Sequence, residues 1–258
     1  MQNLYPLFER NRILKKELLW SLRDYSFSHV QLEYQEYGQG ILQGCALSVH
    51  ENELTVGPGI IKYDKFICLM TEEERIPFAP ADQMQFLKFR VETDRSFPDY
   101  IAYNIELKLD TDATLRNNEF ELCRFNLRHG AQLRGDYTDF VDMDTEYDTV
   151  NLIHSSWGGL GGKTLAPKIT RMFSETILEL ESIRPEDRSF AFLCLSQPGA
   201  IPAVVLKNYV YGDLDGKETH PEDNPAIYKK MCDILNKAGQ GGVRRAGKRK
   251  EKHRIIVD

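Results

Sequence analysis

The segment with the clearest chemical potential is a Gly-rich run, Trp157-Gly-Gly-Leu-Gly-Gly-Lys163-Thr164. Backbone N–H groups and a lysine in such a run can cradle phosphates when the run links a strand to a helix. However, the phosphate-binding pattern requires a glycine where Trp157 stands, and the strand expected at 189–195 ends without the acid that would organise Mg²⁺. The pattern therefore favours a Gly-rich connector that packs closely against a neighbouring segment, and nucleotide binding by residues 158–164 is the alternative.

A second candidate is an acidic run without lysine or arginine, and its spacing imitates the start of a calcium-binding loop. Its members are Asp136, Asp139, Asp142, Asp144, Glu146 and Asp148. A calcium loop that began at Asp142 would need glycine at position 147 and glutamate at position 153, but the chain has Tyr147 and Ile153. We expect a solvated acidic loop that meets a basic partner, with cation binding as the open alternative.

The other reactive side chains are scattered. The six histidines show no metal-binding spacing, and no Gly-x-Ser-x-Gly motif marks a nucleophilic serine. The five cysteines form no C-x-x-C pair, and four of them stand in strand-like runs, which favours buried, reduced thiols. The sequence therefore predicts no catalytic residue, no metal site and no cofactor, and a hydrolase is a weak third hypothesis.

Charge is distributed unevenly along the chain. Residues 237–258 contain eight basic and two acidic residues, a net charge of +6. Because the whole chain has a net charge of −6, the remaining residues carry −12. We expect 238–258 to be a disordered or partner-ordered basic tail that anchors the chain to another subunit. The expected partner-binding residues of this tail are Arg244, Arg245, Lys248, Arg249 and Lys250. Phosphate contacts with nucleic acid are the less favoured alternative, because no aromatic residue is interleaved for base stacking.

At the opposite end, residues 4–24 predict an amphipathic helix. Its apolar stripe consists of Leu7, Leu14, Leu18 and Leu22. A single helix cannot bury such a stripe, so we expect it to dock on its own core or on a neighbouring chain. Charged residues interrupt the apolar run, so it predicts neither a signal peptide nor a membrane span.

The middle of the chain predicts an α+β fold. From 29 to 128 the apolar period is two, and hairpins are expected at 47–56 and 60–70, with strands at 85–92, 100–109 and 119–127. The second half predicts strands at 149–154, 189–195 and 203–211 and helices at 169–183 and 224–236. The expected division is a docking helix (1–28), a β-rich domain (29–150), a mixed region (151–237) and the tail (238–258).

A resemblance covers residues 38–150. The Gly-containing strand at 40–49, the Gly-Pro-Gly turn at 57–59 and the strand pair at 60–70 resemble a pattern of baseplate and tail proteins from contractile phages and phage-tail-like bacteriocins. Residues 121–130 resemble a later element of such proteins, whereas Lys65 stands where they often have glycine. The resemblance implies a structural, non-enzymatic role in or near the baseplate or fibre attachment. It also implies other tail or baseplate subunits as partners, several copies, and a place in the particle after cytoplasmic assembly.

Overall fold

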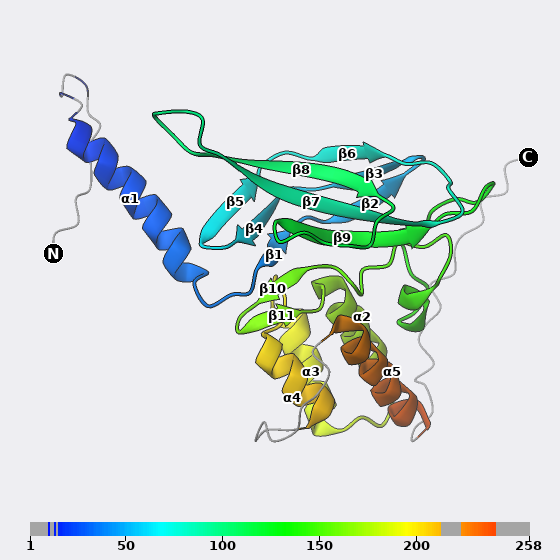
Figure 1. The fold of residues 1–258 in the computed structure, drawn as a ribbon. Helices are drawn as coiled ribbons and strands as arrows, with labels where there is room; N and C mark the ends of the chain where they lie inside the picture. Colours follow the sequence, from blue (N-terminus) through cyan, green and yellow to red (C-terminus); the bar gives the residue numbers. More distant parts are fainter. Residues whose placement is uncertain (1–9, 11–12, 14, 213–222, 241–258) are drawn as a thin grey trace, which may run out of the picture.

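The chain folds into a β-rich body and a helical body that lie one above the other, with one long helix projecting from their junction (Figure 1). The computed structural model describes residues 10, 13, 15–212 and 223–240. The fold is α+β, as the sequence predicts. Within the part of the chain described, no helix combines the length and apolar character needed to cross a bilayer.

A five-stranded sheet joins the two bodies, in the order β11-β10-β1-β4-β5. Its strands are β1 (Gly40–Gly44), β4 (Gly59–Tyr63), β5 (Phe66–Met70), β10 (Trp157–Gly159) and β11 (Gly162–Thr164). Strand β1 runs parallel to β10, with Ile41 opposite Trp157, and the other pairs are antiparallel. The sheet therefore combines strands from both sides of the boundary expected at residue 150.

Two three-stranded antiparallel sheets complete the β-rich body, in the orders β2-β3-β6 and β8-β7-β9. Their strands are β2 (Leu47–His50), β3 (Glu53–Val56), β6 (Glu74–Pro77), β7 (Met84–Asp94), β8 (Ala102–Asp110) and β9 (Glu119–Asn126). The expected hairpins and the three expected strands are confirmed. The β4–β5 turn places Asp64 at a φ of 53°, a conformation that aspartate tolerates better than most residues.

The helical body contains α2 (Pro167–Leu178), α3 (Pro185–Ser196), α4 (Ala203–Tyr211) and α5 (Asn224–Gln240). The helices expected at 169–183 and 224–236 are thus confirmed, with shifted ends. The strands expected at 189–195 and 203–211 are wrong, because these residues form α3 and α4. Each follows a local helix signal: Pro185 stands in the first turn of α3, and α4 ends at Gly212 with a φ of 71°.

The strand expected at 149–154 is also wrong. Thr149 and Asn151 make only isolated bridges, with Arg134 and Arg124 respectively. Just before them the chain forms a short 3₁₀ helix, η1 (Val141–Asp144). Backbone pairing in this segment is therefore limited to single contacts with two different neighbours, too little for a strand.

The projecting helix, α1 (Lys16–Glu33), extends nine residues beyond the end expected at residue 24. The helix begins later than expected: Ile13 and Lys15 are not helical, with Lys15 extended as the N-cap, and residues 4–9, 11, 12 and 14 of the expected helix lie outside the described residues. The extension is stabilised where it meets the β-rich body: Phe27 packs against Phe66 of β5, with ring centroids 6.4 Å apart. The ammonium of Lys62 donates hydrogen bonds to the carbonyl oxygens of Tyr34 (2.7 Å), Gln35 (3.0 Å) and Tyr37 (2.7 Å), directly after α1.

A continuous cluster of buried apolar side chains runs through both bodies. Phe140 stands at their junction, with its ring 5.6 Å from that of Phe173 in α2 and 4.8 Å from that of Tyr228 in α5. The hydroxyl of Tyr228 donates a hydrogen bond to the carbonyl oxygen of Phe140, at 2.5 Å. Apolar packing and a hydrogen bond thus connect the segment before residue 150 to the helices.

Candidate docking sites

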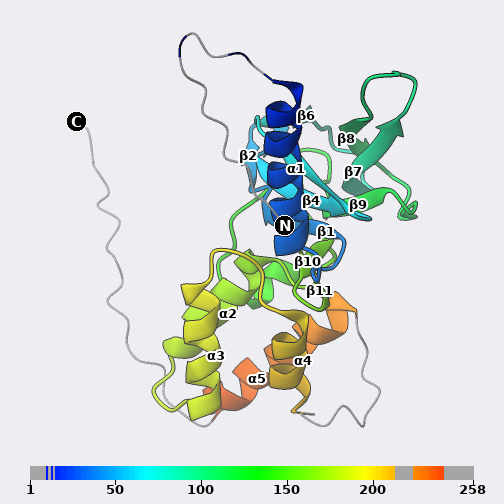
Figure 2. The ribbon, with the colours of Figure 1, turned by 90° about the vertical axis from the view of Figure 1, so that its left-hand side faces the viewer.

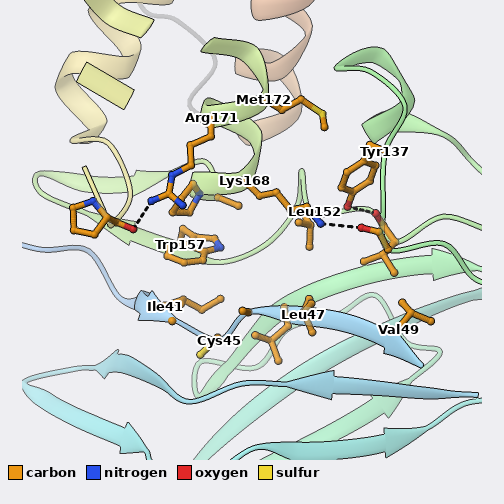
Figure 3. Close-up of a pocket in the computed structure, with 18 of the residues that line it drawn as sticks. Ile41, Cys45, Leu47, Val49, Tyr137, Leu152, Trp157, Lys168, Arg171 and Met172 are labelled. Carbon is orange, nitrogen blue, oxygen red and sulfur yellow. Dashed lines mark hydrogen bonds between the residues drawn. The ribbon is translucent and has the colours of Figure 1, made fainter. Parts of the chain in front are cut away.

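A pocket of about 570 Å³ lies where the β-rich body meets α2 (Figure 3). Part of its floor is one face of β2, because side chains of a strand point alternately to opposite faces. Leu47 and Val49 are half-buried and line the pocket, whereas Ser48 and His50 are exposed. Ile41 of β1 and Trp157 of β10 extend the apolar floor, because the two strands are parallel neighbours. The floor therefore suits apolar side chains of a bound segment.

The rim comes from the first turns of α2, where polar side chains recur at helical spacing. Lys168 donates a hydrogen bond to the carbonyl oxygen of Gly135 at 2.8 Å, and its ammonium lies 4.8 Å from the centre of the Tyr137 ring. Arg171 donates to the carbonyl oxygens of Gln197 and Pro198, both at 2.9 Å. Burial lowers the pKa of Lys168. These cations hold the loops around the pocket in place (Figure 3).

The described lining of the pocket contains few titratable side chains. The only thiol of the lining belongs to Cys45, and burial raises its pKa to about 12, so it stays protonated near neutral pH. Glu175 is the only carboxylate of the lining, so no paired acids are present there. Among the described residues, no group of three or more histidine, cysteine or acidic side chains is arranged to hold a metal ion.

The four cysteines expected to be buried are buried. All five cysteines are free thiols, and Cys232 is half-buried. Cys194 lies in α3 rather than in a strand, and Cys45 lies between β1 and β2.

The Gly-rich run forms the β10–β11 hairpin, so the expected close-packed connector is confirmed. A Cβ atom added to Gly158 would lie 2.2 Å from the carbonyl oxygen of Gly38. The buried Thr164 hydroxyl donates to the carbonyl oxygen of Ile201 at 2.8 Å, and Lys163 is exposed across the hairpin from Gly158. Strand pairing thus occupies main-chain groups of Trp157–Gly159 and Gly162–Thr164, while nucleotide binding at 158–164 stays the alternative prediction.

Two carboxylates of the acidic run pair with arginines of this chain. Asp142 accepts two hydrogen bonds from Arg134, both at 2.8 Å, and others from Thr138 and Thr145. Asp148 pairs with Arg128. The four other acids, Asp136, Asp139, Asp144 and Glu146, are exposed, and Asp139 also accepts a hydrogen bond from the backbone N–H of Asp142 at 2.9 Å. The run is thus partly a structural loop, and only its exposed acids are available to a basic partner.

Of the residues expected to bind partners, two can be placed. Leu18 is half-buried and Leu22 is exposed, both in α1, whose 18 residues include none that is buried. The other expected contacts, Leu7, Leu14, Arg244, Arg245, Lys248, Arg249 and Lys250, lie outside the described residues.

Sequence reasoning missed one exposed feature, the turn between β7 and β8. The rings of Phe97 and Tyr100 stack there with centroids 4.5 Å apart, and both are largely exposed. Two aromatic residues around Pro98 and Asp99 were the available signal, since solvated turns seldom combine such side chains. Figures 1 and 2 show this turn and α1 extending from the β-rich body, away from α2–α5.

No protein-family model matches this sequence, and no curated protein is significantly similar to it. Three solved structures to which this chain is similar are of type VI secretion baseplate proteins. A chain of the TssK–TssF–TssG baseplate subcomplex has a TM-score of 0.41 and 8% identity, covering 93% of this chain and 100% of that one. The crystal structure of TssK has a TM-score of 0.34 and 9% identity, and the match covers 92% of this chain and 69% of that one. A chain of the type VI secretion baseplate complex has a TM-score of 0.42 and 9% identity, and the match covers 92% of this chain and 70% of that one. Likeness at these values is too remote to assign a family or a function.

Proposed function

We propose that this chain is a structural component of a contractile, phage-tail-like particle, in or near the baseplate or fibre attachment. It acts by binding neighbouring subunits, is present in several copies, and enters the particle after assembly in the cytoplasm. The pattern at residues 38–150 supports the class of particle. The neighbours found among solved structures are of a related class, but the support comes from the residues of this chain.

The observation that carries the proposal is α1. Its apolar side chains remain exposed, and they are Leu19, Trp20, Leu22, Tyr25, Phe27 and Leu32. Exposing this many apolar groups to water is unfavourable, and covering them with another surface lowers the free energy. Aromatic and leucine side chains at one helical element are typical of helix-mediated subunit contacts.

Two further surfaces support assembly. The stacked Phe97 and Tyr100 form an aromatic tip, and aromatic side chains are enriched where proteins contact each other. The pocket between β2 and α2 has an apolar floor and fixed cationic walls, which suits an extended segment of another subunit. We include the exposed acids of 136–146 and the basic residues of 238–258 in the proposal as opposite charges that steer docking.

The proposal is tested on particles from the native host after prophage induction. We expect mass spectrometry of sedimented particles to find the chain at a fixed ratio to sheath and tube proteins, and the ratio to survive a high-salt wash. Absence from intact particles would overturn the proposal. In that case salt-dependent DNA binding that is lost on deletion of 238–258 would favour the nucleic-acid alternative.

The contribution of α1 is tested with two matched double variants. Trp20→Gln/Leu22→Gln removes two exposed apolar side chains, and we expect incorporation into particles to fall by about tenfold or more, as loss of two interface anchors does. Arg23→Gln/Asp24→Asn is the control, because these exposed side chains pair with each other. Equal incorporation of both variants would contradict a docking role for α1.

A further inference from the structure

One face of α1 carries a regular stripe. Leu18, Leu22, Tyr25, His29 and Leu32 follow one another at intervals of four, three, four and three residues. This spacing is that of the a and d positions of a heptad repeat, which place side chains along the seam between two helices. Tyr25 is 62% exposed and Leu32 is 65% exposed, so nothing within the described chain covers the stripe.

The opposite face of α1 is the one attached to the body. Phe27, which contacts Phe66, is displaced from the stripe residues by about 140–180° around the helix axis, since successive residues turn by about 100°. Trp20 and Tyr34 are one heptad on either side of Phe27 and share its face. Lys62 fixes the end of this face through its bonds to the carbonyl oxygens of Tyr34, Gln35 and Tyr37. The stripe therefore faces away from the body.

The helix also lacks two local features that stabilise a solitary helix. Its N-cap, Lys15, makes no side-chain capping bond, and its last turn contains no basic residue. Three serines and several aromatic or β-branched residues lower its intrinsic helix propensity. A projecting helix of 18 residues with these features depends on packing against something else.

The residues beside the stripe indicate the partner. The flanking e and g positions, which set partner choice by charge, hold Leu19, Ser21, Ser26, Ser28, Glu33 and Gln35. With one charged residue in six, they cannot select a different helix by opposite charge, and they do not repel an identical helix. A paired copy would also place its body on the outer side, because each body lies opposite its own stripe.

We propose that α1 pairs with α1 of a second copy of this chain through the stripe Leu18, Leu22, Tyr25, His29 and Leu32. This inference names the partner of α1 and rests on the proposed function only in treating α1 as an assembly element. The described stripe spans less than three heptads, so pairing is weak between free copies and becomes strong when other contacts hold the copies together.

Disulfide trapping tests the pairing. Tyr25 is the centre of the stripe. It faces its counterpart in a parallel pair and lies within about one helical turn of it in an antiparallel pair centred on the stripe, so Tyr25→Cys reports both. Arg23→Cys is the matched control, exposed on the same helix but about 160° from Tyr25 around the helix axis. Both are made in the full chain with Cys232→Ser, since the other four native thiols are buried.

Under mild oxidation we expect Tyr25→Cys to form a reducible cross-linked dimer at least tenfold faster than Arg23→Cys. Adding Leu22→Gln to Tyr25→Cys should slow the reaction to the rate of the control. Equal rates for the two cysteine variants, or no dimer from Tyr25→Cys, would overturn the inference. If the trap fails while Trp20→Gln/Leu22→Gln still blocks incorporation, α1 binds a different subunit and the proposed function stands. If the trap succeeds and particles lack the chain, only the proposed function fails.

Discussion

At the scale of single residues, Lys62 shows how a buried charge can fasten one element to another. Its side chain is 8% exposed, and its three ammonium protons match the three carbonyl oxygens that they contact after α1. The end of a helix carries a partial negative charge from unpaired carbonyl groups, which an ammonium offsets. Burial lowers the pKa of Lys62, but hydrogen bonding satisfies the group where it lies.

The first prediction concerns this lysine. Lys62→Met removes the three hydrogen bonds and leaves main-chain oxygens unpaired, so we expect the free energy of unfolding to fall by about 1–3 kcal/mol. Hydrogen exchange should accelerate in residues 27–37. Lys65→Met, in the exposed turn of the same hairpin, is the control and should change stability by less than about 0.5 kcal/mol. Equal effects of the two substitutions would show that Lys62 does not anchor α1.

The second prediction concerns Asp142 and pH. Hydrogen bonds from Arg134 hold the pKa of Asp142 well below its ordinary value of 3.8. A carboxylate with a depressed pKa stabilises the fold above its unfolded pKa, and the stabilisation is lost as pH falls through the folded pKa. Asp142→Asn should therefore lower the free energy of unfolding by about 1–2 kcal/mol at pH 7, given the partial exposure of Arg134.

Urea denaturation at several pH values measures this effect. The difference between wild type and Asp142→Asn should be full above about pH 5 and should shrink as pH falls below about 4. Asp136→Asn, an exposed acid of the same run, provides the comparison and should show no such dependence. A constant difference from pH 7 to pH 3 would contradict the assignment.

At the scale of elements, the Gly-rich run acts through its lack of side chains. Strand β10 approaches the segment before β1 so closely that Gly158 and the carbonyl oxygen of Gly38 leave no room for a methyl group. We therefore expect Gly158→Ala to lower the free energy of unfolding by about 1–3 kcal/mol, as overpacking does. Gly199→Ala is the control, since its new Cβ would lie 3.7 Å from the nearest atom. Chemical denaturation of both variants decides the question, and equal stabilities would contradict the packing role.

Sequence patterns predicted the elements whose signals are local. The turn Asp64-Lys65 marked the β4–β5 hairpin and the Gly-Pro-Gly turn at 57–59 marked the end of β3 before β4, because such residues adopt few backbone conformations. The strand predicted at 189–195 is wrong, because a short apolar run is equally compatible with a buried strand and a buried helix. In α3 the buried residues Phe190, Ala191 and Cys194 follow helical spacing, and the alternation expected of a half-buried strand is absent.

The candidate sites were less predictable than the elements. The pocket depends on β1 and β10 becoming neighbours, which no local pattern in residues 40–44 or 157–159 reveals. Lys62 follows the apolar Ile61 in β4, so strand alternation alone predicts an exposed side chain. In the structure the end of α1 covers it. By contrast, the leucine stripe predicted a helix directly, although the helix continues to Glu33, and its docking role stays a proposal.

At the scale of the whole molecule, the two bodies share one core. Phe140, 1% exposed, contacts α2 and α5 through ring packing, so neither body is closed without the other. The division at residue 150 remains a proposal, and a continuous core favours joint unfolding of the two parts.

The fourth prediction is a single unfolding transition. In a Trp20→Phe background, fluorescence of Trp157 should report unfolding at the same urea concentration as far-UV circular dichroism. Phe140→Ala should lower the free energy of unfolding by about 3–5 kcal/mol and keep the transitions coincident. Val141→Ala, at a neighbouring residue that is 62% exposed, should have little effect. Loss of helical signal before the fluorescence change would show that the bodies unfold separately.

The parallel pairing of β1 with β10 also sets the order of events during synthesis. About 115 residues separate Ile41 from Trp157, and a ribosome adding roughly 5–20 residues per second needs about ten seconds to supply them. Until then the nascent chain presents β1 with one unpaired edge, and such edges invite aggregation. Slower or chaperone-poor expression of this protein should therefore yield insoluble material that forms before α2–α5 are translated.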